Sequence, residues 1–192
     1  MLASYLTEKL LEKELINKSQ QELYAYGLER VIGKIINYGS IMILAVVKHR
    51  VVLSIIFILF FVVLRSWTGG YHAKTKGWCM LGTILIYLIS MQYMLPILEK
   101  RKDVILIGLS VATLVVWWWA PVNHPNISFD EIEVRQYRKR SRIVLIIELI
   151  VIFLLKLVNV KNEYYISASL GIEQCSFLIF MAKMFKQEVK AE

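Results

Sequence analysis

Apolar residues are grouped along this chain in long runs, and charged segments separate one run from the next. The third and fourth of six such runs contain no charge and approach the roughly 20 residues that a helix needs to cross a bilayer. The second run is shorter and follows a charged turn at residues 48–50. The pattern predicts an all-α polytopic membrane helix bundle of about six transmembrane helices, at residues 31–47, 51–64, 80–98, 104–120, 143–160 and 164–182.

The beginning of the chain has a different pattern, in which leucine, isoleucine and tyrosine recur every three or four residues among Glu and Lys. This spacing predicts an N-terminal amphipathic helix over residues 1–28. Such a helix either lies in the membrane interface or packs on the bundle with its polar face solvated, and the sequence leaves both open. We expect one membrane-embedded domain over residues 1–192, with the bundle at 31–182 and a cytoplasmic tail at 183–192.

Composition and charge agree with a membrane protein. Apolar residues make up 57% of the chain and charged residues 20%, whereas an average soluble protein carries about a quarter of its residues as charges. The net charge of +8 is explained by attraction of Lys and Arg to anionic lipid headgroups, so we expect lipids and no nucleic acid as partners. With the N-terminus in the cytoplasm, cytoplasmic segments hold sixteen of the 23 Lys and Arg, which predicts that both termini lie inside.

The segment between the second and third runs carries the candidate chemistry. Gly69 and Gly70 break the preceding helix and allow backbone conformations that other residues avoid. Thr75 is a predicted N-cap of the next helix, which places Cys79 in that helix's first turn, where the positive end of the helix dipole favours a thiolate. His72 lies just before this helix and is positioned to take the thiol proton. A cysteine and a histidine form the minimal nucleophile-and-base unit for acyl transfer.

Other interpretations of these residues remain open from the sequence. A membrane cysteine is commonly a small buried apolar residue, and spacing alone favours that interpretation for Cys79. The Gly-Gly turn, the position at a helix start and the neighbouring basic residues bring the catalytic interpretation to about even with it. We expect Cys175 to pack in mid-helix and His124 to be structural or to contact substrate. No metal or cofactor is expected, because the His and Cys residues lack local ligand spacing. Four polar residues are candidates for a third group that orients His72: Gln92, Asn123, Glu148 and Glu173.

The motif GGYHAK at residues 69–74, preceded by Arg65 and followed by Cys79, resembles the signature of the accessory gene regulator B (AgrB) family. The likeness extends to chain length, the arrangement of the spans and the amphipathic N-terminus. It implies a multi-pass cysteine endopeptidase in the cell membrane of a Gram-positive bacterium, with its active site on the cytoplasmic side. It also implies Cys79 as nucleophile and His72 as general base. Arg65, Gly69 and Gly70 are implied as supporting residues.

The resemblance further implies a substrate and a reaction. Cys79 attacks a peptide bond of a short AgrD-like quorum-sensing propeptide, which releases the C-terminal tail and leaves a thioester. An internal Cys or Ser of the propeptide then captures the acyl group as a cyclic thiolactone or lactone. We expect the basic loop that contains Arg138, Lys139 and Arg140 to anchor the chain at the cytoplasmic face or to bind the acidic tail. A homodimer is implied by resemblance alone.

Two different functional classes are alternatives to a peptidase. In a peptide transporter without proteolytic activity, the intramembrane charges Glu148, Lys156 and Glu173 line a path. Neither an internal repeat nor the phosphate-binding pattern GxxxxGK[ST] occurs in the chain, which counts against a transporter. A non-enzymatic scaffold or sensor would leave Cys79 inert.

Overall fold

The regular elements of the protein are helices in the part of the chain that the structure describes, a computed structural model covering residues 2–73, 75–122 and 130–187. The all-α prediction is therefore confirmed. In order, the elements are α1 (Leu2–Glu12), the 3-10 turn η1 (Lys18–Gln20), α2 (Gln21–Val47), α3 (Val51–Thr68), α4 (Lys76–Ile89), the π-helical turn η2 (Ser90–Met94), α5 (Leu95–Lys100), α6 (Lys102–Trp119), α7 (Glu131–Leu157) and α8 (Asn162–Met184).

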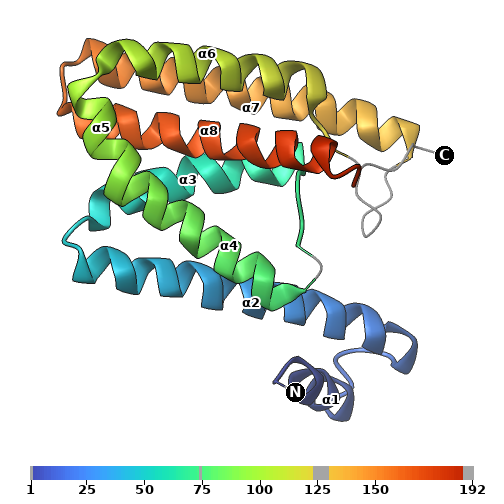
Figure 1. Ribbon diagram of the computed structural model, residues 1–192. Coiled ribbons are helices and arrows are strands. Elements are labelled where there is room, and N and C mark those ends of the chain that lie inside the picture. Colours follow the sequence, from blue (N-terminus) through green and yellow to red (C-terminus); the bar gives the residue numbers. More distant parts are fainter. Residues whose placement is uncertain (1, 74, 123–129, 188–192) are drawn as a thin grey trace.

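Helix α8 forms the centre of the bundle and packs on α3, α6 and α7, and α7 also packs on α3 (Figure 1). Close approach of α3 and α8 depends on small residues, as is usual between membrane helices. A Cβ atom on Gly171 would lie 2.8 Å from Cβ of Phe60, so only glycine fits there. The Ser167 hydroxyl donates a hydrogen bond of 2.6 Å to the carbonyl oxygen of Leu53, which joins the two helices. Helix α4 packs mainly on α2 rather than on this centre.

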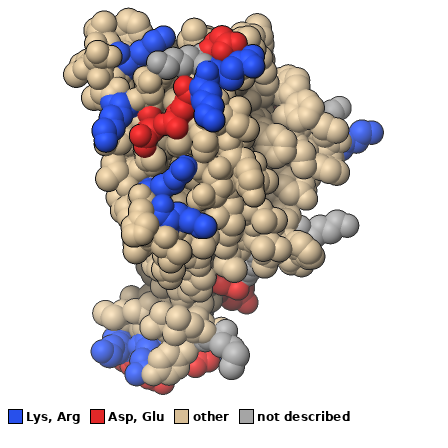
Figure 2. Space-filling view, turned by 60° about the vertical axis from the view of Figure 1, so that its left-hand side comes forward, with Lys and Arg blue, Asp and Glu red and all other residues tan. Residues whose placement is uncertain are grey.

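The outer surface of the bundle is apolar. Large hydrophobic side chains such as Leu59, Ile107 and Phe153 are more than half exposed, at 56%, 64% and 64%. Most of the bundle surface in Figure 2 carries no charge, and charged side chains gather in small groups, one of them on α1 at the bottom of the view. A surface of this kind is suited to lipid rather than water.

Within the described part of the chain, four helical segments are long and apolar enough to cross a membrane: Lys18–Val47, Val51–Thr68, Gly77–Lys100 and Asn162–Met184. The apolar helix at Asp103–Trp119 is shorter. Helix α7 begins among charged residues, and its apolar part occupies only its second half. The protein is thus an all-α membrane bundle, whereas the expected count of about six spans stays a prediction.

The predicted helix over residues 1–28 is wrong in its extent. Helix α1 ends at Glu12, and Glu14 has a positive φ of 54°, which breaks the helix. The chain becomes helical again at η1, where the main-chain N–H of the N-cap residue Asn17 donates to Oε1 of Gln20 at 3.1 Å. The rest of the predicted segment is continuous with the first predicted span, as part of α2.

The basic loop expected before the fifth span is also a helix. Helix α7 starts at Glu131 because Asp130 and Glu133 form a capping box: the N–H of Glu133 donates to Oδ1 of Asp130 at 2.6 Å, and the N–H of Asp130 donates to Oε2 of Glu133 at 3.2 Å. Arg138, Lys139 and Arg140 are consequently exposed on a regular helix surface. Their relative positions are therefore set by helix geometry.

Candidate active site

The Gly-Gly motif lies at one end of the bundle, where α3, α6 and α8 end and α4 and α7 begin (Figure 1). Helix α3 stops at Thr68 because Gly69 and Gly70 have φ values of 63° and 125°, a region that favours glycine. The N–H of Val122 donates to the carbonyl oxygen of Thr68 at 2.9 Å, and a Cβ atom on Gly69 would lie 2.6 Å from the Val122 oxygen. The predicted helix break is confirmed.

The side chain of Arg65 holds the loop that follows the glycines. Its Nη2 donates to the carbonyl oxygen of Tyr71 at 2.9 Å. A Cβ atom on Gly70 would overlap Nη1 of Arg65, so the missing side chain makes room for the guanidinium. Nη1 itself is buried and has no hydrogen-bond partner among the described residues. Arg65 therefore uses one side of its guanidinium for the loop and leaves N–H groups on the other side available.

The same loop is attached to the end of α8. The N–H of Tyr71 donates to the carbonyl oxygen of Leu178 at 2.8 Å, and its ring lies 5.5 Å from the ring of Phe185. The Gln187 side chain accepts from the N–H of His72 at 3.1 Å and donates to the His72 carbonyl oxygen at 2.8 Å. These paired bonds fix the main chain of His72, whose side chain is partly buried.

Cys79 lies where the sequence predicts it, in the first turn of α4. Thr75 is the N-cap: its Oγ1 accepts from the N–H of Trp78 at 3.3 Å, and its carbonyl oxygen accepts from the N–H of Cys79 at 3.0 Å. Cys79 is partly exposed and free. Cys79, Cys175 and Tyr38, from α4, α8 and α2, lie within electrostatic range of the Arg65 guanidinium.

The remaining candidates occupy different settings. Cys175 is fully buried and donates to the carbonyl oxygen of Phe61 at 3.2 Å, which confirms the packing role. Glu148, Glu173 and Gln92 each have a buried polar atom without a hydrogen-bond partner among the described residues. Asn123 and His124 lie outside those residues. In the described part of the chain, no group of three or more His, Cys, Asp and Glu residues is arranged to hold a metal ion.

Comparison with known proteins establishes the family. The model of the family described as "AgrB: Accessory gene regulator B" matches residues 2–181. The chain belongs to the AgrB family. It is similar to a Clostridium perfringens (strain 13 / Type A) protein named "Putative AgrB-like protein 2", with 24% identity over 147 residues, 73% of this chain and 67% of the relative. No solved structure matches. The AgrB family processes AgrD-type propeptides, so the general role of this membrane protein is in quorum-sensing propeptide processing.

In this AgrB protein the basic part of α7 lies beside the motif. The Arg140 guanidinium is 4.8 Å from the ring centroid of Trp67, which is two residues before Gly69 on the last turn of α3. The Tyr137 ring also contacts Trp67, with centroids 5.5 Å apart. Arg142 donates to the carbonyl oxygen of Trp117 at the end of α6, with Nη2 at 3.1 Å. Arg140 of α7 therefore lies against the last turn of α3, beside the Gly-Gly turn.

Sequence reasoning did not find three residues of this AgrB site: Tyr38, Leu178 and Gln187. Gln187 and His72 are 115 residues apart in the chain, and the bonds use the main chain of His72. Leu178 contributes only a carbonyl oxygen, which every residue has. No local pattern could have indicated these contacts.

Proposed function

We propose that this protein is a membrane-embedded cysteine endopeptidase that removes the C-terminal tail of an AgrD-like propeptide and promotes cyclisation of the remaining peptide. The observation that carries this proposal is Cys79 in the first turn of α4, within electrostatic reach of Arg65 and seven residues after His72. Membership of the AgrB family supplies the substrate class. The partners of the protein are then the propeptide, membrane lipids and, on resemblance to the family, a second copy.

In the first step His72 takes the proton of the Cys79 thiol, and the thiolate attacks the carbonyl carbon of the scissile bond. Collapse of the tetrahedral intermediate breaks the C–N bond, and the proton held by His72 passes to the leaving nitrogen. The tail departs with a new amino terminus, and the acyl group stays on Cys79 as a thioester. A general base within reach of the nucleophile contributes typically 10²–10⁴-fold to such steps.

In the second step a thiol or hydroxyl group of the propeptide attacks the thioester carbonyl. Its proton passes through His72 to the departing Cys79 sulfur, which restores the free enzyme and releases a thiolactone or lactone. No water is consumed, so exclusion of water from the thioester favours cyclisation over hydrolysis. The apolar surroundings of a membrane bundle support this requirement.

Arg65 has the geometry of a positioning residue with an electrostatic effect on the nucleophile. Its Nη2 group holds the Tyr71 carbonyl next to His72, and its Nη1 group is unpaired among the described residues. A fixed positive charge in this position stabilises the oxyanion that develops in the tetrahedral intermediate. Such preorganised charge acts strongly where water is scarce.

The proposal is tested by trapping the acyl-enzyme. A propeptide whose internal Cys or Ser is replaced by Ala is unable to cyclise, so the thioester should accumulate. Intact mass spectrometry of the reconstituted enzyme should show an added mass equal to the N-terminal fragment minus water, which hydroxylamine removes. Peptide mapping should place it on Cys79. Tail release without any adduct, or an adduct on Cys175, would contradict the mechanism.

A peptide exporter without proteolytic activity is a second candidate, since Glu148 and Glu173 present unpaired buried carboxyl oxygens on α7 and α8 among the described residues. It predicts transfer of uncleaved propeptide across vesicles and no covalent adduct. The trapping experiment therefore separates the two functions.

We further propose that Arg138, Lys139 and Arg140 on α7 bind the acidic tail on the cytoplasmic side. Replacing all three by Gln should raise the KM for propeptide several-fold at low salt, because the complementary charge is lost. The KM of the wild type should rise with ionic strength and that of the variant much less. Initial rates over a salt series measure this.

The matched control for that variant is replacement of Lys100, Arg101 and Lys102 by Gln, which removes three basic residues at the α5–α6 turn, at the opposite end of the bundle. It should leave the KM unchanged. Impermeant labelling of His49→Cys, at an exposed position in the α2–α3 turn, reports whether each variant keeps its orientation. Equal KM increases in both triple variants, or a salt-independent wild type, would contradict tail binding.

A further inference from the structure

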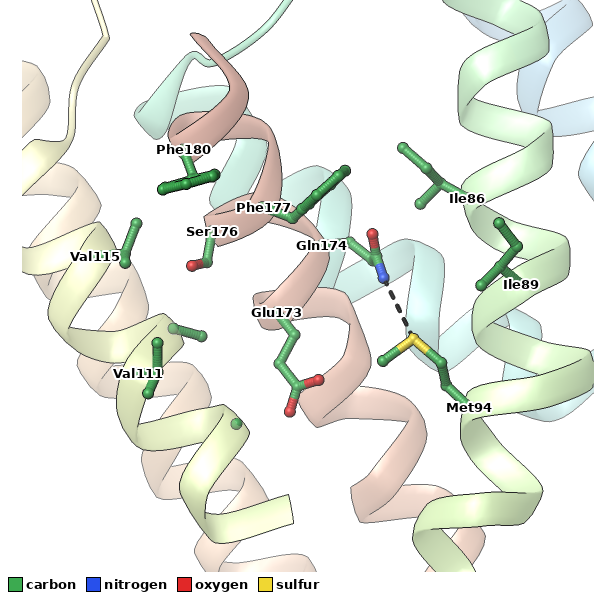
Figure 3. A pocket seen from close by; sticks show the side chains of 12 residues that line it. Ile86, Ile89, Met94, Val111, Val115, Glu173, Gln174, Ser176, Phe177 and Phe180 are labelled. Atoms are coloured by element: carbon green, nitrogen blue, oxygen red, sulfur yellow. Dashed lines mark hydrogen bonds between the residues drawn. The ribbon is translucent and has the colours of Figure 1, made fainter. Parts of the chain in front are cut away.

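A cavity of about 570 Å³ lies between the α4–η2 segment, α6 and α8 (Figure 3). Its walls are mostly apolar, with polar groups from Glu173, Gln174 and Ser176. The cavity exists because α4 packs mainly on α2, whereas α8 packs on α3 and α6. Its size is within the range of roughly 300–1,000 Å³ that ligand sites occupy, and a few polar groups in an apolar wall are typical of such sites.

The two long walls of the cavity belong to α4 and α8, and both helices also contribute residues to the candidate active site. Ile86 lines the cavity and is seven residues after Cys79 on α4, so the two side chains share one face of the helix about 10 Å apart. Phe177 on the opposite wall is adjacent to Leu178, whose carbonyl oxygen holds Tyr71. A peptide bound at Cys79 would reach the cavity with about three extended residues, at roughly 3.3 Å each.

One carboxyl group, that of Glu173, lines the cavity. The side chain of Glu173 extends from α8 into the space towards α6 (Figure 3), and its Oε1 is buried without a hydrogen-bond partner among the described residues. Gly108 on α6 makes room for it, since a Cβ atom there would lie 2.7 Å from Oε1. A buried polar atom of this kind has a cost unless a partner completes its hydrogen bond.

The neighbouring amide is already used by the fold. Nε2 of Gln174 donates to Oγ of Ser90 at 2.9 Å and lies 3.9 Å from the sulfur of Met94, which joins α8 to the π-helical turn η2 (Figure 3). Such turns are frequent at functional sites. The contact fixes one wall of the cavity and does not involve Glu173.

We propose that this cavity is the specificity pocket of the enzyme. It takes apolar side chains within about three residues of the scissile bond on the acyl side of the propeptide, and Glu173 accepts a hydrogen bond from an N–H group of the peptide. The inference rests on the proposed peptidase function. The acyl side is the part that stays bound to Cys79 through both steps. The acidic tail is assigned instead to the cations of α7, of which Arg140 lies against Trp67 beside the Gly-Gly turn.

The test fills the pocket and compares two substrates. Val115→Trp places a large ring in the cavity, and Leu114→Trp is its matched control, since the neighbouring Leu114 is 48% exposed and does not line the pocket. Kinetics in lipid nanodiscs would use one propeptide with large apolar residues before the scissile bond and one with alanines there. The wild-type kcat/KM should be about tenfold or more higher for the first propeptide than for the second. This ratio is the effect of losing at least one apolar contact in a hydrophobic pocket.

Val115→Trp should abolish most of that preference, mainly through the KM, while the alkylation rate of Cys79 by iodoacetamide stays at the wild-type value. Leu114→Trp should behave as the wild type. Glu173→Leu should lower kcat/KM for both propeptides, and Glu173→Gln, which keeps an acceptor, should restore part of it. An unchanged preference in Val115→Trp overturns the inference, as does a preference that follows the acyl-chain length of the nanodisc lipid, which would show a lipid in the cavity.

The two proposals fail in distinguishable ways. If the wild type forms no thioester on Cys79, the peptidase function fails and the pocket loses its substrate. If the thioester forms and Val115→Trp keeps the wild-type preference, only the pocket assignment fails.

Discussion

Replacing Cys79 by alanine should reduce tail release from the propeptide by about 10³-fold or more, and His72→Ala should have a similar effect. The double variant should be little worse than either single variant, because a nucleophile and its base act as a unit. The Cys79→Ala enzyme lacks the sulfur on which the proposed thioester forms. Measurement requires rates of tail release at equal amounts of membrane-inserted protein.

Two further variants define the chemistry. Cys79→Ser should retain almost no activity, since a hydroxyl is far less acidic than a thiol and His72 alone activates it poorly. Cys175→Ala should stay active, because this thiol is fully buried and bonded to the Phe61 carbonyl. Wild-type-like processing by Cys79→Ala would refute the peptidase proposal. Multiplicative losses in the double variant would show that His72 and Cys79 act independently.

The parts of this protein that could be predicted from sequence are those with local physical causes. Apolar runs predict helices because every backbone polar group must be satisfied within the lipid. The helix break at Gly69-Gly70 and the cap at Thr75 follow from backbone preferences of single residues, and both occur as expected. The placement of Cys79 in the first turn of α4 follows from that cap.

The two boundaries that the sequence pattern predicts wrongly lie in segments with weak local signals. The start of α7 is encoded by the capping box of Asp130 and Glu133, although the basic residues after it are typical of a loop. The end of α1 depends on the left-handed conformation of Glu14, and the conformational preference of a glutamate does not predict it. Both errors concern boundaries in charged segments, where the hydrophobic pattern carries little information.

The contacts that assemble the site could not be predicted, because they join distant parts of the chain through common groups. Tyr71 bonds to the main chain of Leu178, and the side chain of Gln187 bonds to the main chain of His72. Arg65 illustrates the difference: its place in the motif indicated importance, whereas its bond to the Tyr71 carbonyl appears only in the fold. The catalytic pairing of His72 with Cys79 stays a prediction.

Gly70→Ala should abolish most propeptide processing, although the change adds a single methyl group. Gly70 has a φ of 125°, where an L-residue is strained by on the order of 1–3 kcal/mol. The added Cβ atom would overlap Nη1 of Arg65 and lie 3.2 Å from the carbonyl carbon of Leu178. The guanidinium must therefore move away from the loop, and the bond from its Nη2 to Tyr71 is lost. We expect a loss of at least about 10²-fold, the scale on which misplacement of a catalytic group acts.

The chain offers a matched control two residues before Cys79. Gly77 lies in the first turn of α4 and has open space where a Cβ atom would be added, so Gly77→Ala should process propeptide within about twofold of the wild type, as surface changes usually do.

If Gly70 acts through Arg65, then Arg65→Ala should lose as much activity as Gly70→Ala, and combining the two should add little. Arg65→Lys should not restore the activity. A lysine lacks the planar fork of arginine, in which one N–H group donates to the Tyr71 carbonyl and a second N–H group stays buried beside it. Tail-release rates and iodoacetamide labelling of Cys79 measure both effects at matched membrane insertion. Near-normal processing by Gly70→Ala, or an equal loss in Gly77→Ala, would show that propeptide processing does not depend on the contact between Gly70 and the Arg65 guanidinium.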